Sequence, residues 1–162
     1  MNCGTLPYDE FVKSVKSFAA ISNRISDGWI LHEDHENYKT YVQKHTFLCN
    51  NNRLLKTEYV ISYNVSFGVP SFSFNIWDST GMLLSLDEIR AMTSLSINAK
   101  DFYSVVTQQE HAIFHRPYFV VHPCHTEELI QVFKDKTKNI IVTFLGLISP
   151  LVNLDLPLEY GL

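Results

Sequence analysis

The 162-residue sequence predicts an α+β fold in which helices pack against one antiparallel sheet. Three observations lead to this class: an amphipathic segment near the N-terminus, several segments whose apolar residues alternate, and a further helical region after residue 122. Apolar residues make up 46% of the chain and aromatic residues 13%, which is enough for one core. Since no linker or low-complexity tract interrupts the pattern, we expect a single domain over residues 1–162.

The first predicted element is an amphipathic helix over residues 8–25. Pro7 suits the first turn of a helix, and Gly28 follows shortly after its end. The apolar residues that recur at helical spacing are Tyr8, Phe11, Val12, Val15, Phe18, Ala19 and Ile25.

The segments that follow have the two-residue period of strands. "GWILHED" (28–34) and "YKTYVQKHTF" (38–47) predict two strands joined through residues 34–37. "EYVISYNVSF" (58–67) gives the clearest alternation in the chain. The residues that we expect on its inward face are Tyr59, Ile61, Tyr63, Val65 and Phe67, and those on its other face are Val60, Ser62, Asn64 and Ser66.

The break after this run predicts a hairpin. Gly68-Val69-Pro70 interrupts the alternation, and "SFSFNIW" (71–77) resumes it before the turn residues 78–81. We therefore expect residues 57–67 and 71–77 to pair as antiparallel strands, with Phe72, Phe74 and Ile76 facing inward.

The second half of the chain is less regular. Ser85 and Glu88 have the spacing of a capping box, which predicts a short helix from residue 85. The stretch 101–116 is ambiguous, and we interpret it as a short strand followed by a polar loop. "PYFVV" (117–121) predicts a buried strand.

Two segments near the C-terminus complete the prediction. "TEELIQVFK" (126–134) predicts a helix with Glu127 and Glu128 in its first turn. The stretch 139–147 is apolar enough to be either a helix or a buried strand, and both alternatives stay open.

Charge and cysteine content narrow the functional classes. The net charge of −4 and the absence of a Lys/Arg stripe argue against a nucleic-acid partner. The N-terminus lacks the basic and apolar regions of a signal peptide, and the apolar run 140–152 is too short to span a bilayer and contains Pro150. Three cysteines do not pair evenly, which argues against a disulfide framework. We therefore expect a soluble, cytoplasmic protein.

The sequence His122-Pro123-Cys124 combines features of a reactive cysteine. Pro123 fixes its own φ angle and holds His122 in an extended conformation, so Cys124 lies where a strand ends and a helix begins. We expect Thr126, or else His125, to cap this helix. The positive end of a helix favours a thiolate over a thiol, as would a neighbouring protonated imidazole.

Other interpretations of Cys124 remain. If the nearby histidines are incidental, Cys124 is only a small apolar residue at the end of a strand. A metal site would draw on His111, His115, His122 and His125 together with the thiol. The sequence lacks both the paired cysteines of structural zinc sites and an HExxH motif, which argues against a metal. A cysteine hydrolase would also need a histidine and an Asn or Asp, and these residue types are common in any chain.

Three segments resemble the autophagy-type ubiquitin-conjugating-like enzymes, which carry an HPC motif at the end of an apolar strand. They are "YNVSFGVPSFSFNIWDSTGMLLSLDEI" (63–89), "TQQEHAIFHRPYFVVHPCHT" (107–126) and "ISPLVNLDLPLEY" (148–160). The resemblance covers most of residues 52–160. It implies a ubiquitin-conjugating core, which is a four-stranded antiparallel sheet with helices packed on it.

The resemblance also implies a function. Enzymes of this family accept a ubiquitin-like protein from an activating enzyme as a thioester and pass it to a lysine. By position, Cys124 would be the thioester nucleophile, with His122, Glu110 and His111 as candidates for the groups around it. The implied modifier is ubiquitin-like autophagy protein twelve, and the implied acceptor is autophagy protein five. Neither a metal nor another cofactor is implied. The alternatives are an inert partner-binding domain and a cysteine hydrolase of ubiquitin-like conjugates.

One feature departs from ordinary ubiquitin-conjugating enzymes, which place an asparagine shortly before the cysteine to stabilise the oxyanion. Residues 110–123 contain no asparagine. The oxyanion donor must then be a backbone N–H or another side-chain amide. The amides that we consider are those of Gln108, Gln109, Asn64 and Asn75.

Overall fold

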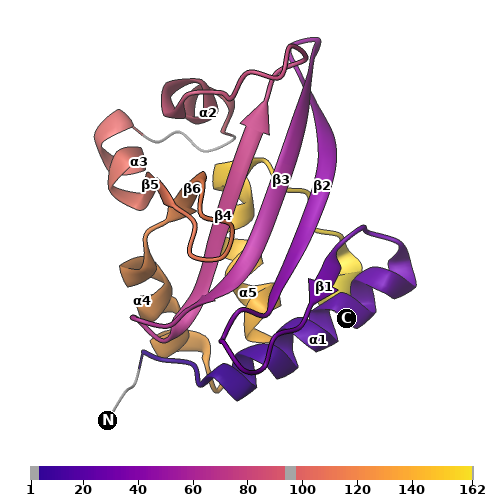
Figure 1. Cartoon of the computed structure of the whole chain (residues 1–162), viewed down its shortest axis with the longest axis vertical. Coiled ribbons are helices and arrows are strands. Elements are labelled where there is room, and N and C mark those ends of the chain that lie inside the picture. Colours follow the sequence, from indigo (N-terminus) through magenta and orange to yellow (C-terminus); the bar gives the residue numbers. More distant parts are fainter. Residues whose placement is uncertain (1–3, 94–97, 162) are drawn as a thin grey trace.

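The computed structural model describes residues 4–93 and 98–161 (Figure 1). The helices in these ranges are α1 (Tyr8–Ile25), α2 (Leu86–Met92), α3 (Ala99–Val105), α4 (Pro123–Phe133), α5 (Ile140–Val152) and a 3₁₀ turn, η1 (Leu158–Gly161). The strands are β1 (Ile30–His32), β2 (Tyr41–Asn50), β3 (Arg53–Asn64), β4 (Val69–Trp77), β5 (Val106–Glu110) and β6 (Pro117–Val121).

The strands form one sheet in the order β1-β2-β3-β4-β6-β5, and all neighbours are antiparallel. The predicted α+β class and antiparallel sheet are confirmed. The sheet has six strands rather than the four that the family resemblance implied. The two edge strands are the short β1 and β5, and β5 lies in the stretch that was ambiguous in the sequence. The prediction of an antiparallel sheet is therefore unchanged.

The predicted central hairpin is confirmed by the pairing of β3 with β4, in which Tyr59 lies opposite Phe74 and Asn64 opposite Val69. However, the alternation that we predicted extends to residue 67, beyond the end of β3 at Asn64. The Asn64 side chain accepts a hydrogen bond from the Phe67 N–H (2.9 Å), and this closes the turn before the last apolar residues. Val65 and Phe67 therefore lie outside the strand and are 63% and 39% exposed instead of facing the core.

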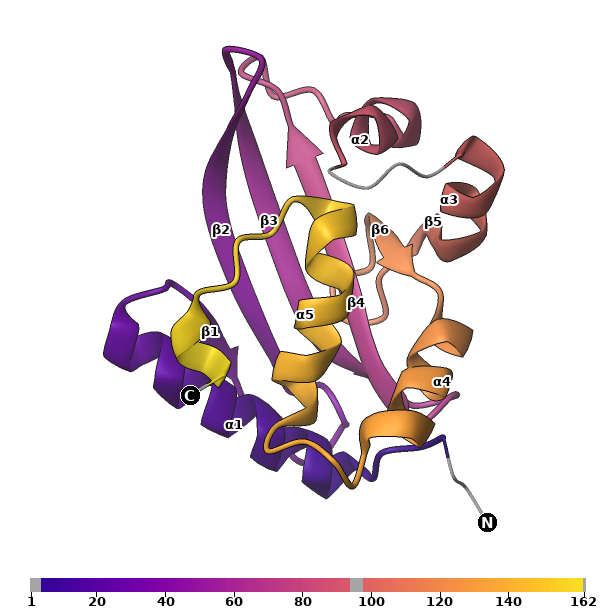
Figure 2. The same cartoon turned by 180° about the vertical axis from the view of Figure 1, so that it is seen from behind.

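The helices α1, α4 and α5 lie on one face of the sheet (Figure 2). The bounds predicted for α1 are confirmed. The alternative left open for residues 139–147 is decided in favour of a helix. Asn139 caps it by accepting a hydrogen bond from the Ile141 N–H (2.9 Å), and Phe144 on its inner side is buried. The Tyr59 hydroxyl reaches across to the Val152 carbonyl (3.3 Å), which joins the sheet to α5.

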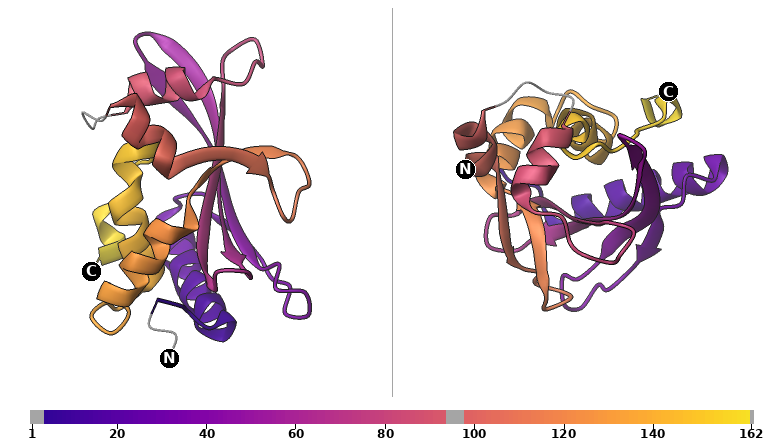
Figure 3. Two further views of the ribbon diagram at one scale, coloured as in Figure 1. Left: turned by 90° about the vertical axis from the view of Figure 1, so that its left-hand side faces the viewer. Right: turned by 90° about the horizontal axis from the view of Figure 1, so that it is seen from above.

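The opposite face of the sheet is partly covered by the turn between β5 and β6, which projects away from the helices (Figure 3). A second apolar cluster forms beneath this turn, from Val60, Tyr118 and Val120 with Tyr41 and Phe114 at its edge. Because both faces are covered here, β3 is buried continuously over residues 57–62 rather than at every second residue.

Between β4 and β6 the chain forms two short helices. The predicted capping box is present in α2, where Ser85 Oγ accepts from the Glu88 N–H and Glu88 Oε1 accepts from the Ser85 N–H (both 3.2 Å). In the ambiguous stretch 101–116 the predicted short strand exists as β5. The prediction missed α3, whose first turn is capped by Asn98.

Candidate active site

The site forms at the turn that joins β6 to α4. β6 ends at Val121, and the His122 N–H donates to the carbonyl of Val105 at the end of α3 (2.7 Å). Pro123 is the first residue of α4 and is buried, and Cys124 follows as the second residue of the helix. The thiol therefore belongs to the first helical turn. The start of this turn is held by the hydrogen bond of His122 to Val105 and by the burial of Pro123.

The helix begins earlier than we predicted. His122 is the N-cap, since its Nδ1 accepts a hydrogen bond from the Cys124 N–H (3.2 Å), and neither His125 nor Thr126 has this role. Pro123 suits the first position of a helix because it has no N–H to satisfy there. As a result Glu127 and Glu128 lie beyond the first turn, contrary to the prediction, and Thr126 is buried.

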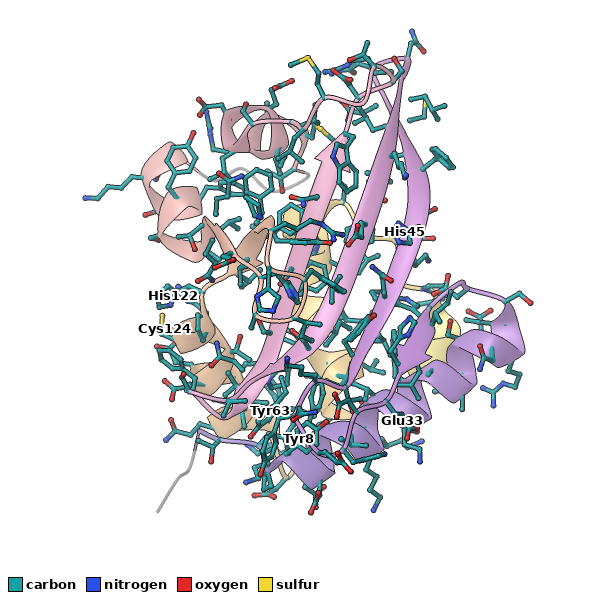
Figure 4. All side chains as sticks on the ribbon, viewed as in Figure 1. Tyr8, Glu33, His45, Tyr63, His122 and Cys124 are labelled. Atoms are coloured by element: carbon teal, nitrogen blue, oxygen red, sulfur yellow. The ribbon has the colours of Figure 1, made fainter. Side chains whose placement is uncertain are left out.

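Cys124 is exposed, and its side chain lies beside His122 at the surface (Figure 4). The Phe67 ring stands edge-on to the His122 ring, with their centroids 6.5 Å apart. The turn between β3 and β4 is thus next to the cysteine, a neighbour that the sequence reasoning missed because Phe67 was assigned to the core. Cys49 is also exposed, on β2, and Cys3 lies outside the described residues.

The hydrogen bond to Nδ1 restricts where the His122 ring can carry hydrogen. A nitrogen that accepts carries no hydrogen, so a neutral His122 has its hydrogen on Nε2. A protonated ring would lose the bond to Cys124. His122 Nδ1 thus holds the backbone of the cysteine, and the protonated imidazole that we considered from the sequence could not accept this hydrogen bond.

This cap has a measurable effect on stability. Replacing His122 with Ala leaves the Cys124 N–H without its acceptor, and we expect the free energy of unfolding to fall by about 1 kcal/mol. Replacing His122 with Asn restores a side-chain oxygen at the cap, and this variant should lose clearly less. Urea denaturation of both variants measures the difference. Equal losses would show that the ring does not act as a cap.

The backbone donors of this turn are already in use. Pro123 has no N–H, the Cys124 N–H bonds to the His122 ring, and the His125 N–H bonds to the His122 carbonyl (3.3 Å). In this conformation the backbone of residues 123–125 therefore offers no free N–H donor. Of the four amides considered, Asn75 already donates to the Pro117 carbonyl (3.1 Å), whereas Asn64 lies on the turn that contacts His122.

The two remaining amides, Gln108 and Gln109, lie on β5 together with Glu110, and His111 follows the last residue of this strand. Val106 pairs with Val121 near the cysteine, and Glu110 pairs with Pro117 at the opposite end of the β5–β6 hairpin. Four residues of strand separate the two ends by about 13 Å. The structure therefore brings His122 to Cys124 but does not bring Glu110 or His111 there, because a hairpin carries its turn away from its open end.

His111 instead belongs to the aromatic cluster under the β5–β6 turn. It is 4% exposed, and its ring lies 4.6 Å from the Phe114 ring and 4.9 Å from the Tyr118 ring, centroid to centroid. Its Nδ1 accepts from the Ile113 N–H (3.1 Å). Burial lowers the pKa of His111 to about 4, against an opposing effect of the nearby Glu58 charge. A structural role in folding the turn explains these contacts.

This lowered pKa predicts a pH-dependent stability. The pKa of His111 is about 4 in the folded chain and 6.5 in its reference state, so the unfolded chain binds the extra proton between these values. The stabilisation is complete above pH 6.5 and is lost as the pH falls toward 4. We expect the free energy of unfolding to fall more steeply over this window in the wild type than in a His111→Gln variant. Parallel pH profiles in urea titrations would contradict this assignment.

Among the described residues, no group of three or more His, Cys, Asp or Glu side chains is arranged to hold a metal ion. Of the imidazoles considered for a metal site, His111 packs with Tyr118 near the β5–β6 turn, whereas His122 caps α4 at the other end of β6. In the same described part of the chain, no helix has the length and apolar character needed to cross a membrane.

The model of the family "Autophagocytosis associated protein, active-site domain" matches residues 10–159, which is nearly the whole chain. The chain belongs to this family. It is 33% identical over 117 residues to the ubiquitin-like-conjugating enzyme ATG10 of Homo sapiens, covering 67% of this chain and 53% of that protein.

A second relative agrees with this family, and a solved structure shares the fold of the chain. The chain is 29% identical over 114 residues to the ubiquitin-like-conjugating enzyme ATG10 of Arabidopsis thaliana, covering 63% of this chain and 51% of that one. The crystal structure of the autophagic E2 Atg10 has the same fold, with a TM-score of 0.56 at 14% identity over 91% of this chain and 94% of that chain. The chain spans about half the length of the curated relatives that it matches.

Proposed function

We propose that this chain is a conjugating enzyme that carries a ubiquitin-like protein on Cys124 as a thioester and transfers it to a lysine. The observation that carries the proposal is the exposed thiol in the first turn of α4, within a family named for its active-site domain. The names of the relatives as ubiquitin-like-conjugating enzymes support the same reaction.

In the first step, the Cys124 thiolate attacks the carbonyl of the thioester on an activating enzyme. The sulfur of that enzyme leaves as a thiolate, so one thioester is broken and one is formed, with no oxidant, metal or small cofactor. The start of α4 favours negative charge at the attacking sulfur. His122 holds the Cys124 backbone in place through Nδ1.

In the second step, the amine of an acceptor lysine attacks the thioester, and Cys124 leaves. A free lysine has a pKa of about 10.4, so deprotonating it near neutral pH costs roughly 4–5 kcal/mol, which desolvation or a base must offset. Glu110 and His111 lie at the far end of the β5–β6 hairpin, so we assign them to the structure of the hairpin rather than to this proton transfer. We place the oxyanion donors among side chains near the turn, with Asn64 as the first candidate.

The partners follow from the resemblance of the three sequence segments and from the family. We propose ubiquitin-like autophagy protein twelve as the modifier, autophagy protein five as the acceptor, and the activating enzyme of the autophagy system as the donor. We place this reaction in the cytoplasm.

The proposal is tested by incubating the chain with activating enzyme, nucleotide and modifier. An adduct that a thiol reductant removes supports conjugation. A complex without a covalent bond would favour the binding-domain alternative, and cleavage of a preformed conjugate would favour the hydrolase. Either of the last two results, without a labile adduct, contradicts the proposal.

A further inference from the structure

The segment formed by residues 4–6 lies between two elements that flank Cys124, the turn from β3 to β4 and the helix α4 (Figure 2). The Leu6 N–H donates to the Gly68 carbonyl in the turn (2.7 Å). Lys134, which follows the last residue of α4, donates from Nζ to the Thr5 carbonyl (3.1 Å). We call residues 4–6 the strap, because this segment ties the turn to the helix.

Two glycines allow the strap to approach both elements closely. A Cβ on Gly4 would lie 3.1 Å from the Glu127 carbonyl oxygen, which belongs to the backbone of α4. A Cβ on Gly68, which has a φ of +67°, would lie 3.3 Å from the Thr5 side chain. The buried side chain of Leu6 anchors the strap in the core. The strap is therefore held by close backbone contacts on both sides.

The turn from β3 to β4 reaches the nucleophile through one side chain. Phe67 precedes Gly68, and its ring stands edge-on to the His122 ring at a centroid distance of 6.5 Å. The Nδ1 of the His122 ring accepts from the Cys124 N–H (3.2 Å). Phe67 is 39% exposed, so its position depends on the turn that carries it more than on core packing. The place of this turn relative to α4 therefore decides whether the Phe67 ring supports the His122 cap.

We propose that the strap positions the conjugation site: by tying the β3–β4 turn to α4, it holds the Phe67 ring beside His122 and so keeps the cap on Cys124 in place. The effect of the strap on the reaction rests on the proposed function, whereas its effect on the cap does not. The strap and Phe67 are positioning residues, because they act through His122 and not on the thioester itself. Displacing a reacting group by about 1 Å slows an enzyme about 100-fold, so even a smaller shift has a measurable effect.

The first test observes the cap in the uncharged protein by NMR. Gly4→Ala forces the strap away from the Glu127 carbonyl. We expect hydrogen exchange of the Cys124 amide to become about threefold faster, because the cap opens more often. Gly161→Ala is the matched control, since an added Cβ there meets nothing within 4 Å, and its Cys124 amide should exchange as in the wild type. An unchanged exchange rate at Cys124 in Gly4→Ala, with or without a loss of global stability, overturns the proposal.

The second test measures transfer from the preformed thioester at increasing concentrations of acceptor. Lys134→Met removes the donor to the Thr5 carbonyl and keeps the aliphatic stem. We expect the maximal rate to fall about fivefold and the half-saturating acceptor concentration to stay unchanged, because the strap orients the site and does not dock the acceptor. Lys136→Met, at an exposed lysine two residues further on, is the matched control and should transfer like the wild type. A maximal rate that stays at the wild-type value in Lys134→Met overturns the proposal, whatever happens to the half-saturating concentration.

The path through Phe67 is tested by a rescue and by a double variant. Phe67→Ala removes the ring and should lower the maximal rate as Lys134→Met does, whereas Phe67→Tyr keeps a ring and should recover most of the rate. Adding Lys134→Met to Phe67→Ala should cause little further loss, because both changes act on the same support of His122. Fully additive losses contradict this path.

These outcomes separate the two proposals. If the wild type never forms a thioester, the proposed function itself fails, and the exchange of the Cys124 amide still decides the role of the strap. If the wild type charges normally but Lys134→Met transfers at the wild-type rate, only the strap proposal fails. If Gly4→Ala does not fold, the exchange measurement is made on Lys134→Met, with Lys136→Met as its control.

Discussion

Replacing Cys124 with Ala should remove every reductant-labile adduct between this chain and a ubiquitin-like modifier, because no other sulfur occupies the first turn of α4. Replacing Cys124 with Ser keeps a nucleophilic oxygen in nearly the same place. The product is then an oxygen ester, which resists thiol reductant and should accumulate. Gel electrophoresis with and without reductant distinguishes the two products.

The matched control uses the other cysteines. Cys49 and Cys124 are both exposed, so accessibility alone does not distinguish them. They differ in position, because Cys49 lies in strand β2 and Cys124 lies at the start of a helix. The double variant Cys3→Ala with Cys49→Ala should charge at the wild-type rate. A labile adduct that survives in Cys124→Ala and disappears in this double variant would mean that Cys3 or Cys49, and not Cys124, carries the modifier.

The second large effect concerns the attachment of the β5–β6 hairpin to the sheet. Glu58 is 3% exposed, and its Oε1 accepts hydrogen bonds from the Tyr118 hydroxyl and from Gln43 Nε2 (3.2 Å). Arg116 Nη2 lies 3.8 Å from the same oxygen and donates to the Tyr118 hydroxyl (2.7 Å). Burial and the Glu58 carboxylate together raise the pKa of Tyr118. Its hydroxyl therefore stays protonated and donates its hydrogen to Glu58.

Glu58→Ala should lower the free energy of unfolding by about 3 kcal/mol, because it leaves a buried hydroxyl without an acceptor. Glu58→Gln keeps an oxygen acceptor and should lose less than half as much. Adding Tyr118→Phe removes the stranded hydroxyl, so the double variant should be more stable than the sum of the two single losses predicts. Strictly additive losses in urea denaturation would contradict a direct Glu58–Tyr118 coupling.

Features encoded by nearby residues were predictable from the sequence. The capping box of Ser85 and Glu88 needs only a four-residue segment, and the β3–β4 hairpin needs two alternating runs and a break. The position of Cys124 at a strand-to-helix turn followed from the apolar run 117–121, from Pro123 and from the helical segment 126–134. In each case the determining contacts lie within a few residues along the chain.

Features that depend on contacts between distant segments were not predictable. Phe67 was assigned to the core, yet it contacts His122, 55 positions along the chain. His111 and Glu110 are close to Cys124 in sequence, but the hairpin turns them to the other face of the sheet. The choice of His122 as the cap depended on a ring orientation that residue-type preferences, which favour Thr126, do not include.

The central claim is that Cys124 carries the modifier. The most direct measurement is mass spectrometry of the charged protein, digested at a pH that preserves thioesters, to locate the attached modifier. The account predicts the C-terminal carbonyl of the modifier on the peptide that contains Cys124, and loss of this mass after treatment with a thiol reductant. A reductant-labile modifier on the peptide that contains Cys49, with an unmodified Cys124 peptide, would contradict it.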